Sequence, residues 1–138
     1  MLPLIAVLAL VAPVPKPKAA GLDLRDPDGV VLVSAAEISQ YDWDTHTLTV
    51  PEAVKAKLED DTPTGFAVYL DGKPVYRGLF WRARADEPCP GPVILLGDTP
   101  ADQIRIDFNY GGSDPRPEDD ARRDPAVHTA LQASGKLK

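Results

Sequence analysis

Hydrophobic and polar positions follow one another along the chain in short segments, a pattern typical of strands joined by turns. Turn residues at 26–29 precede an apolar run at 30–33, which predicts a buried strand. A second apolar run, 93–96, is expected as a central strand. Strict alternation over 103–110 predicts a strand that buries one face. That face would carry Ile104, Ile106, Phe108 and Tyr110.

The dipeptide Asp71-Gly72 marks the clearest hairpin. Residues 66–70 and 73–77 on either side are rich in β-branched and aromatic side chains, and Asp-Gly accepts the positive φ angles of a two-residue turn. Segment 41–50 predicts a second tight hairpin with a turn near 44–45. Counting outward from Asp71-Gly72 predicts two cross-strand pairs: Val68 with Val75, and Ala67 with Tyr76.

Helical signals begin with a capping box. Ser34 and Glu37 are spaced so that each satisfies a free backbone donor of the other, and they predict one helical turn that carries Ile38 into the core. Pro51 suits the start of a middle helix because its fixed φ is already helical. The packed face of this helix would carry Val54 and Leu58.

A C-terminal helix follows a loop. Asp124 is a good N-cap, Pro125 suits the first turn, and Gly135 is typical of a helix end. Together these elements predict an α+β fold: a single small domain, mostly antiparallel sheet, with one packed middle helix and a C-terminal helix. The domain would span 21–138 and be rich in loops at 21–29 and 111–123.

Residues 1–20 have the features of a signal peptide. An uncharged apolar core of about a dozen residues is too short to cross a bilayer and is followed by a proline–lysine hinge and small residues. We expect cleavage after Ala19 or Ala20. A short uncleaved anchor or a buried N-terminal strand is the alternative. The mature protein would be secreted or periplasmic, with no stable membrane span.

Charge and cysteine content narrow the classes of partner. The 138-residue chain has 15 Lys and Arg against 21 Asp and Glu, a net charge of −6. This sign argues against binding to nucleic acid or to an anionic membrane surface. One cysteine excludes an internal disulfide, and 43% hydrophobic residues suffice for a core.

The sequence contains no recognisable catalytic, metal or cofactor motif, and we expect none of these. Its two histidines, His46 and His128, lack metal-ligand spacing. We interpret His46 as a turn histidine bonded to local backbone. The alternative is a hydrolase in which His46 pairs with Asp44. Its nucleophile would be Ser39 or Ser113, although no Gly-x-Ser-x-Gly motif supports it.

Cys89 lies in the proline-rich segment 87–92. We interpret it as a free thiol in a rigid loop, with pairing between chains as the alternative. A rigid loop would also suit an inhibitor, because it loses little entropy on docking. Segment 23–29 resembles part of a calcium loop but lacks its first and last ligands, so a plain turn is expected. The acidic runs 59–61 and 118–120 are interpreted as solvated loops.

Four aromatic residues are the candidate binding residues. Flat rings stack on sugars or peptide side chains, although aromatic residues in strands more often belong to the core. A pair of exposed tryptophans would define a carbohydrate-binding module. The candidates are Tyr41, Trp43, Tyr76 and Trp81.

The order of motifs from 30 to 110 resembles the head subdomain of the first periplasmic domain of SecD, the protein-export membrane protein. The resemblance rests on residues 32–38 (LVSAAEI), 48–53 (LTVPEA) and, most strongly, 66–76 (FAVYLDGKPVY). It implies a small α+β sheet and a periplasmic peptide-handling module rather than transport. The pattern Tyr-x-Trp-x-x-His at 41–46 is also similar to small exported bacterial proteins, which implies no function.

We therefore expect a non-enzymatic domain of the bacterial cell envelope that binds an envelope or secreted protein or peptide. An exposed strand of the Asp71-Gly72 hairpin would accept an extended peptide by strand addition. A secreted protease inhibitor, a carbohydrate-binding module and a hydrolase are the alternatives.

Overall fold

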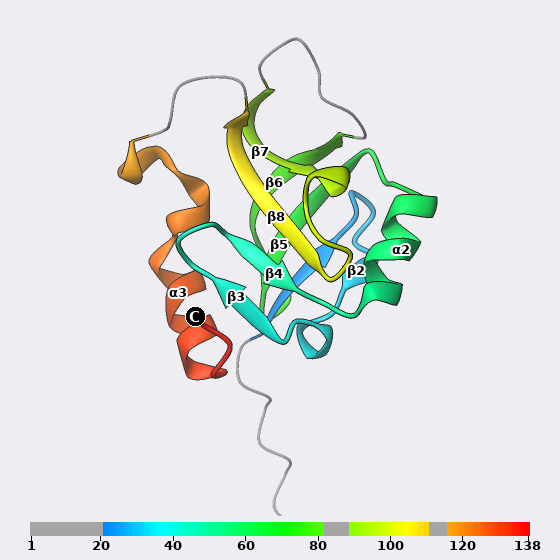
Figure 1. Ribbon diagram of the computed structural model, residues 1–138. Helices are drawn as coiled ribbons and strands as arrows, with labels where there is room; N and C mark the ends of the chain where they lie inside the picture. Colours follow the sequence, from blue (N-terminus) through cyan, green and yellow to red (C-terminus); the bar gives the residue numbers. More distant parts are fainter. Residues whose placement is uncertain (1–20, 82–88, 111–115) are drawn as a thin grey trace, which may run out of the picture.

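A curled eight-stranded sheet forms the body of the molecule (Figure 1). The computed structural model describes residues 21–81, 89–110 and 116–138. The strand order is β2-β1-β5-β6-β7-β8-β4-β3, and neighbours are antiparallel except β6 and β7. The predicted α+β fold with a mostly antiparallel sheet is confirmed. The bounds are β1 Leu22–Arg25, β2 Val31–Val33, β3 Gln40–Asp42, β4 Thr47–Thr49, β5 Gly65–Leu70, β6 Lys73–Trp81, β7 Cys89–Leu95 and β8 Gln103–Tyr110.

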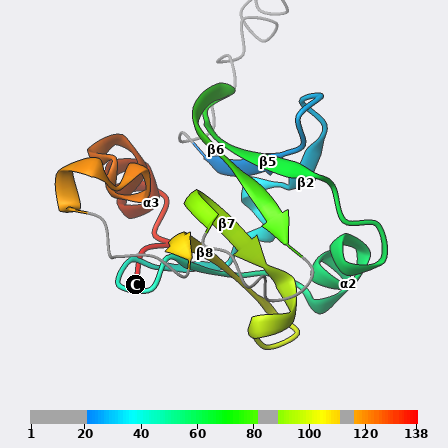
Figure 2. The same cartoon turned by 90° about the horizontal axis from the view of Figure 1, so that it is seen from above.

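Two α-helices flank the sheet on opposite sides, α2 (Glu52–Asp60) and α3 (Pro125–Ala133) (Figure 1). Seen from above, β2, β5 and β6 lie in one layer and β7 and β8 in another (Figure 2). The apolar core joins residues of both layers, for example Val33 and Val68 of the first with Ile94 and Ile106 of the second. No helix in the described part of the chain is long and apolar enough to cross a membrane.

The Asp71-Gly72 turn is confirmed, but the register beyond it is not as predicted. Asp71 and Gly72 have φ angles of 50° and 77°, as a two-residue hairpin turn requires. A bulge then leaves Val75 out of the ladder, so that Val68 pairs with Tyr76 instead. Pro74 explains the shift, because it has no N–H to donate to β5 and the regular ladder is interrupted there.

Several other local predictions are confirmed. Residues 40–49 form a hairpin of β3 and β4. Ser34 N–H donates to Glu37 Oε1 at 2.9 Å, and the resulting 3₁₀ turn η1 (Ala35–Glu37) precedes the buried Ile38. Asp124 accepts a hydrogen bond from the N–H of Ala126 at the start of α3.

The prediction of a loop over 21–29 is wrong for its first half. Leu22–Arg25 forms β1, which lies between β2 and β5. Only 26–29 make the expected turn, in which Asp26 Oδ1 accepts from the N–H groups of Asp28 and Val30. The run 30–33 is a strand as predicted, but an edge strand: Val33 is buried, whereas Val31 is 47% exposed.

Candidate functional site

Two of the four predicted binding residues belong to the core. Tyr41 of β3 and Tyr76 of β6 are both buried, so neither presents a ring face to a ligand. Burial is also the main reason that the pKa of each phenol is raised. The prediction of a binding surface that includes Tyr41 and Tyr76 is therefore wrong. Tyr41 alternates with the polar residues Gln40 and Asp42 because one face of β3 packs inward.

The two tryptophans are partly exposed but lie on different parts of the sheet. Trp43, in the β3–β4 turn, packs edge-on against His46 and His128, with ring centroids 5.1 and 4.8 Å apart. Trp81 is the last residue of β6 and pairs with Leu95 of β7. The strands β7, β8 and β4 separate β6 from β3. The structure does not combine the two indoles into one flat platform of the kind that a carbohydrate module needs.

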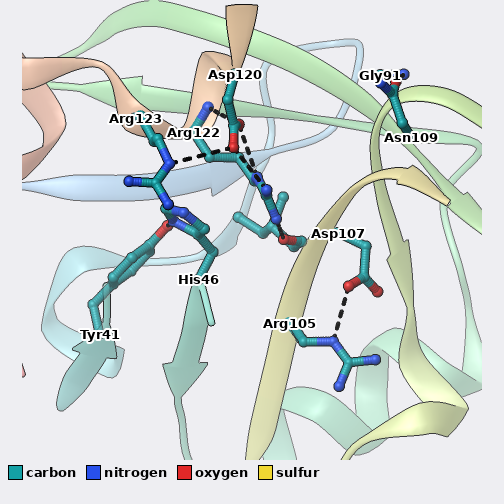
Figure 3. Close-up of polar contacts among 10 residues, drawn as sticks. Tyr41, His46, Gly91, Arg105, Asp107, Asn109, Asp120, Arg122 and Arg123 are labelled. Atoms are coloured by element: carbon teal, nitrogen blue, oxygen red, sulfur yellow. Dashed lines mark hydrogen bonds and ion pairs between the residues drawn. The ribbon is translucent and has the colours of Figure 1, made fainter. Parts of the chain in front are cut away.

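His46 is the centre of a buried polar cluster (Figure 3). It ends the β3–β4 turn with φ 54°, and its side chain is 1% exposed. Nδ1 lies 2.8 Å from the Tyr41 hydroxyl, and Nε2 is buried with no hydrogen-bond partner among the described residues. The prediction that the His46 side chain bonds to local backbone is wrong, because its imidazole instead forms a hydrogen bond with the Tyr41 hydroxyl. Its backbone carbonyl accepts from the N–H of Ile106, which continues the ladder to β8.

Burial also controls the charge of His46. Loss of hydration and, next, the positive charge of Arg122 lower its pKa to about 4. The imidazole is therefore neutral at physiological pH. A hydrolase would need His46 next to a nucleophile at an open pocket; Ser39 instead donates to the Thr49 carbonyl, and Ser113 lies outside the described residues. This geometry gives the hydrolase alternative no support.

Arg122 and Asp120 form an ion pair beside His46 in this cluster (Figure 3). The guanidinium makes two hydrogen bonds to the carboxylate, of 2.9 and 2.7 Å, and a third to the Ile106 carbonyl, of 2.9 Å. Burial alone would raise the pKa of Asp120, but the bond to Arg122 and its charge make the net shift downward. Asp120 is buried, so the prediction of a solvated run at 118–120 is wrong at its last residue.

The proline-rich segment is not a projecting loop where the structure describes it. Residues Cys89 to Pro92 belong to β7, and Cys89 and Pro92 pair with Tyr110 and Phe108 of β8. Gly91 donates its N–H to the side-chain oxygen of Asn109. This sheet pairing contradicts the rigid-loop interpretation of 89–92; residues 87–88 lie outside the described part. The described part of this segment therefore does not offer the rigid projecting loop on which the protease-inhibitor alternative depends.

Lys55 is a buried charged residue whose burial the sequence pattern did not predict. It lies on α2 beside the predicted face of Val54 and Leu58, yet it is 1% exposed. Its Nζ donates to the carbonyls of Thr99 and Pro100 and to the Thr99 hydroxyl, each at 2.8 Å. All three ammonium protons are thus used, and the role is to fasten α2 to the 96–102 connection.

One edge of the sheet is closed by the chain itself. Residues 136–138, which follow α3, run parallel to β3. The N–H of Tyr41 donates to the Lys136 carbonyl at 2.8 Å, and the N–H of Lys138 donates to the Tyr41 carbonyl at 2.9 Å. Lys136 Nζ also bonds the Ala35 carbonyl. The outer backbone groups of β3 are therefore satisfied at Tyr41.

The other edge is open. Strand β2 pairs with β1 on one side, and no strand of the described residues pairs with its outer side. Next to it lies a cavity of about 300 Å³ between β2 and α2, hereafter the β2–α2 groove. Val30 and Val31 are 58% and 47% exposed. The apolar lining of the groove consists of Val30, Val31, Leu32, Val54, Leu58 and Pro63.

The sequence contained one signal for this groove, the unbroken apolar run at 30–33. An antiparallel strand with one solvated face is expected to alternate, and this run does not. A short apolar run of this kind predicts a buried strand. The structure shows that the surplus valines instead line an open edge.

The fold and groove define the class of the molecule as an α+β domain with a curled sheet and one open edge. Comparisons with family models, curated proteins and solved structures return no match. Among the described residues, no group of three or more His, Cys, Asp or Glu side chains is placed to hold a metal ion.

Proposed function

We propose that the protein is a non-enzymatic domain that binds an extended peptide or a strand of another protein at its open sheet edge. The observation that carries this proposal is the combination at β2 of an outer edge without a strand partner in the described chain and an adjoining apolar groove. Strand addition uses both parts: backbone hydrogen bonds supply affinity, and the groove receives alternate side chains.

The accepting strand differs from the one inferred from the sequence. Of the two hairpin strands, β5 lies between β1 and β6. β6 pairs with β7 only along Leu79–Trp81, and nearer the turn its Val75 lines a cavity together with residues of 117–125. We propose β2 as the acceptor in place of the hairpin, because β2 adjoins a groove lined mainly by apolar residues, whereas residues of 117–125 lie beside the hairpin part of β6. The exposure of Val30 and Val31 supports this choice, because the described chain has only one other large exposed hydrophobic residue, Leu79.

The test is a selection of binders from a random decapeptide library, followed by amide chemical-shift mapping on the isotope-labelled protein. Bound peptides should shift the amides of β2 and the groove side of α2. A Val31→Asp variant should bind at least about tenfold more weakly, because a charge replaces an apolar contact and must be desolvated. Val31→Ile is the matched control and should retain binding. Binders that shift only amides outside β2 and α2 would refute the proposal.

We also propose that the protein is exported and acts at the bacterial cell envelope, as the resemblance to the periplasmic SecD subdomain implies. The features of residues 1–20 support export. Fusing residues 1–25 to a reporter that is active only outside the cytoplasm should yield activity. A stable but inactive fusion would contradict export without affecting the proposal for β2.

We propose, finally, that α2 is the packed middle helix of the predicted fold. Burial of Leu58 and the three bonds of Lys55 support this. Amides of α2 should then exchange hydrogen only as fast as the molecule unfolds as a whole. Faster exchange confined to α2 would show a helix that opens on its own.

A further inference from the structure

The charges around the β2–α2 groove are unequal in sign. Besides its apolar residues, the groove is lined by three carboxylates, Asp26, Glu37 and Asp61, and by one cation, Lys57. Three negative charges and one positive charge leave a local balance of −2. The groove is therefore an apolar channel with an acidic rim.

The end of α2 strengthens this negative field. Asp61 is the C-cap residue, and Glu59 and Asp60 precede it in the last turn, all of them exposed. A helix C-terminus already carries partial negative charge, so carboxylates there cost stability rather than add to it. Their position beside the groove adds to the attraction for a cation that approaches α2.

We propose that the occupant of the groove is an extended peptide that alternates apolar residues with Lys or Arg. This inference rests on the proposed function of β2 and specifies its ligand. In an added strand, successive side chains point to opposite faces. Apolar residues on one face would pack on Val54 and Leu58. The basic residues point to the opposite, solvated face, where the negative field of the rim carboxylates Asp61 and Glu37 still attracts their charge.

Charge also decides against a second copy of this chain as the occupant. Pairing two β2 strands would bring two acidic rims together, within a pair of molecules that each carry a net charge of −6. Like charges across an interface oppose association. A basic partner instead gains from the same field, and its association rate would fall as salt is added.

Three octapeptides test the proposal: Val alternating with Lys, with Ser or with Glu, each carrying a fluorophore. Anisotropy titrations of the protein should rank them Lys, Ser, Glu, with about tenfold between Lys and Ser, as expected for a few rim charge pairs. The preference for Lys should shrink at high salt. Amide shifts should place the Lys peptide at β2.

Two charge-reversal variants separate the groove from the overall charge of the protein. Asp61→Lys should abolish the preference for the Lys peptide, and its lysine at a helix end favours the fold. Glu118→Lys changes net charge equally on the exposed η3 turn (Pro117–Asp119), far from α2 (Figure 1), and should keep the preference.

Four other results would contradict the basic ligand, the acidic rim, the proposed function or the peptide as occupant. Equal affinities for the three peptides, all mapping to β2, would refute the basic ligand and leave the proposed function standing. Equal loss of preference in both variants would reduce the effect to net charge and refute the rim. Peptides that fail to reach β2 would refute the proposed function itself. A dimer that forms through β2 in sedimentation experiments would replace the peptide with a second copy.

Discussion

The two edges of the sheet differ in how their backbone groups are satisfied. At β3, residues 136–138 supply both a donor and an acceptor to Tyr41. At β2, the outer backbone groups face no strand of the described chain, and two exposed valines stand beside a groove. An open edge invites pairing with other chains, and natural proteins usually cover or blunt it.

The contrast identifies where binding should be sought. Residues 136–138 cover the outer side of β3, which shows that a short segment of this chain can close a sheet edge. β2 is only three residues long, which limits unspecific pairing, and the groove adds side-chain contacts that a specific partner needs. Substitutions at the β3 edge should therefore affect stability, and substitutions at β2 should affect binding.

The largest expected loss of stability follows from truncating a buried side chain of α3, the helix that precedes the residues closing the β3 edge. Leu131 of α3 is buried, and its carbonyl accepts from the N–H of Lys136. Leu131→Ala should lower the free energy of unfolding by about 2–5 kcal/mol, because a cavity remains in the core. Val31→Ala at the open edge should change it by less than about 0.5 kcal/mol. Urea denaturation measures both, and equal losses would remove the distinction between the edges.

Acid should destabilise the closed edge through His46. Its folded pKa of about 4 lies below the unfolded value near 6.5, so the folded state favours the neutral ring. The resulting stability is present above pH 6.5 and is lost as pH falls towards 4, by about 3 kcal/mol in all.

Denaturation curves at several pH values between 7 and 4 test this dependence. His46→Gln cannot titrate and should flatten the curve in this window. Asp120 does not interfere, because its pKa is lowered and its contribution disappears only below the window. An unchanged slope in His46→Gln would assign the acid sensitivity to other groups.

Opening the closed edge should have a smaller cost and a visible consequence. Lys138→Pro removes the N–H that donates to the Tyr41 carbonyl, a loss of about 1 kcal/mol. Lys138→Ala keeps the N–H and should behave like the parent protein. Sedimentation at high concentration should detect self-association in the proline variant, since β3 becomes available. Two monomeric variants of equal stability would show that this bond does not protect the edge.

The smallest expected effect is that of removing the Tyr76 hydroxyl, and Tyr41 is the phenol to compare it with. Tyr41→Phe removes the partner of His46 Nδ1 and should cost about 1–2 kcal/mol. The hydroxyl of Tyr76 is buried and has no hydrogen-bond partner in the described part of the chain, so Tyr76→Phe should be neutral or slightly stabilising. Thermal unfolding of both variants checks the difference, and a larger loss in Tyr76→Phe would reveal a bond that this hydroxyl makes.

Features that depend on a few neighbouring residues could be predicted from the sequence. The Asp71-Gly72 turn, the bond between Ser34 and Glu37 and the cap at Asp124 each follow from short-range geometry and occur as expected. Alternation likewise predicted the buried faces of Ile104 and Ile106, because side chains in a strand alternate whatever the partner.

Features that depend on distant partners were decided by the tertiary structure. Lys55 is buried because Thr99 and Pro100 present acceptors to it, and His46 because Tyr41 and the Asp120–Arg122 pair enclose it. No local pattern contains those partners, and a burial prediction for a polar residue requires them.

The open edge belongs to the same category. The apolar run at 30–33 specifies a strand, but the run alone does not distinguish a central from an edge position, because strand propensity depends on the neighbouring strands. Which strand lies at the edge depends on the order in which all eight pair, and on where residues 136–138 return. The sequence by itself determined the strands and turns through local backbone chemistry; tertiary pairing alone determined which strand kept a free side.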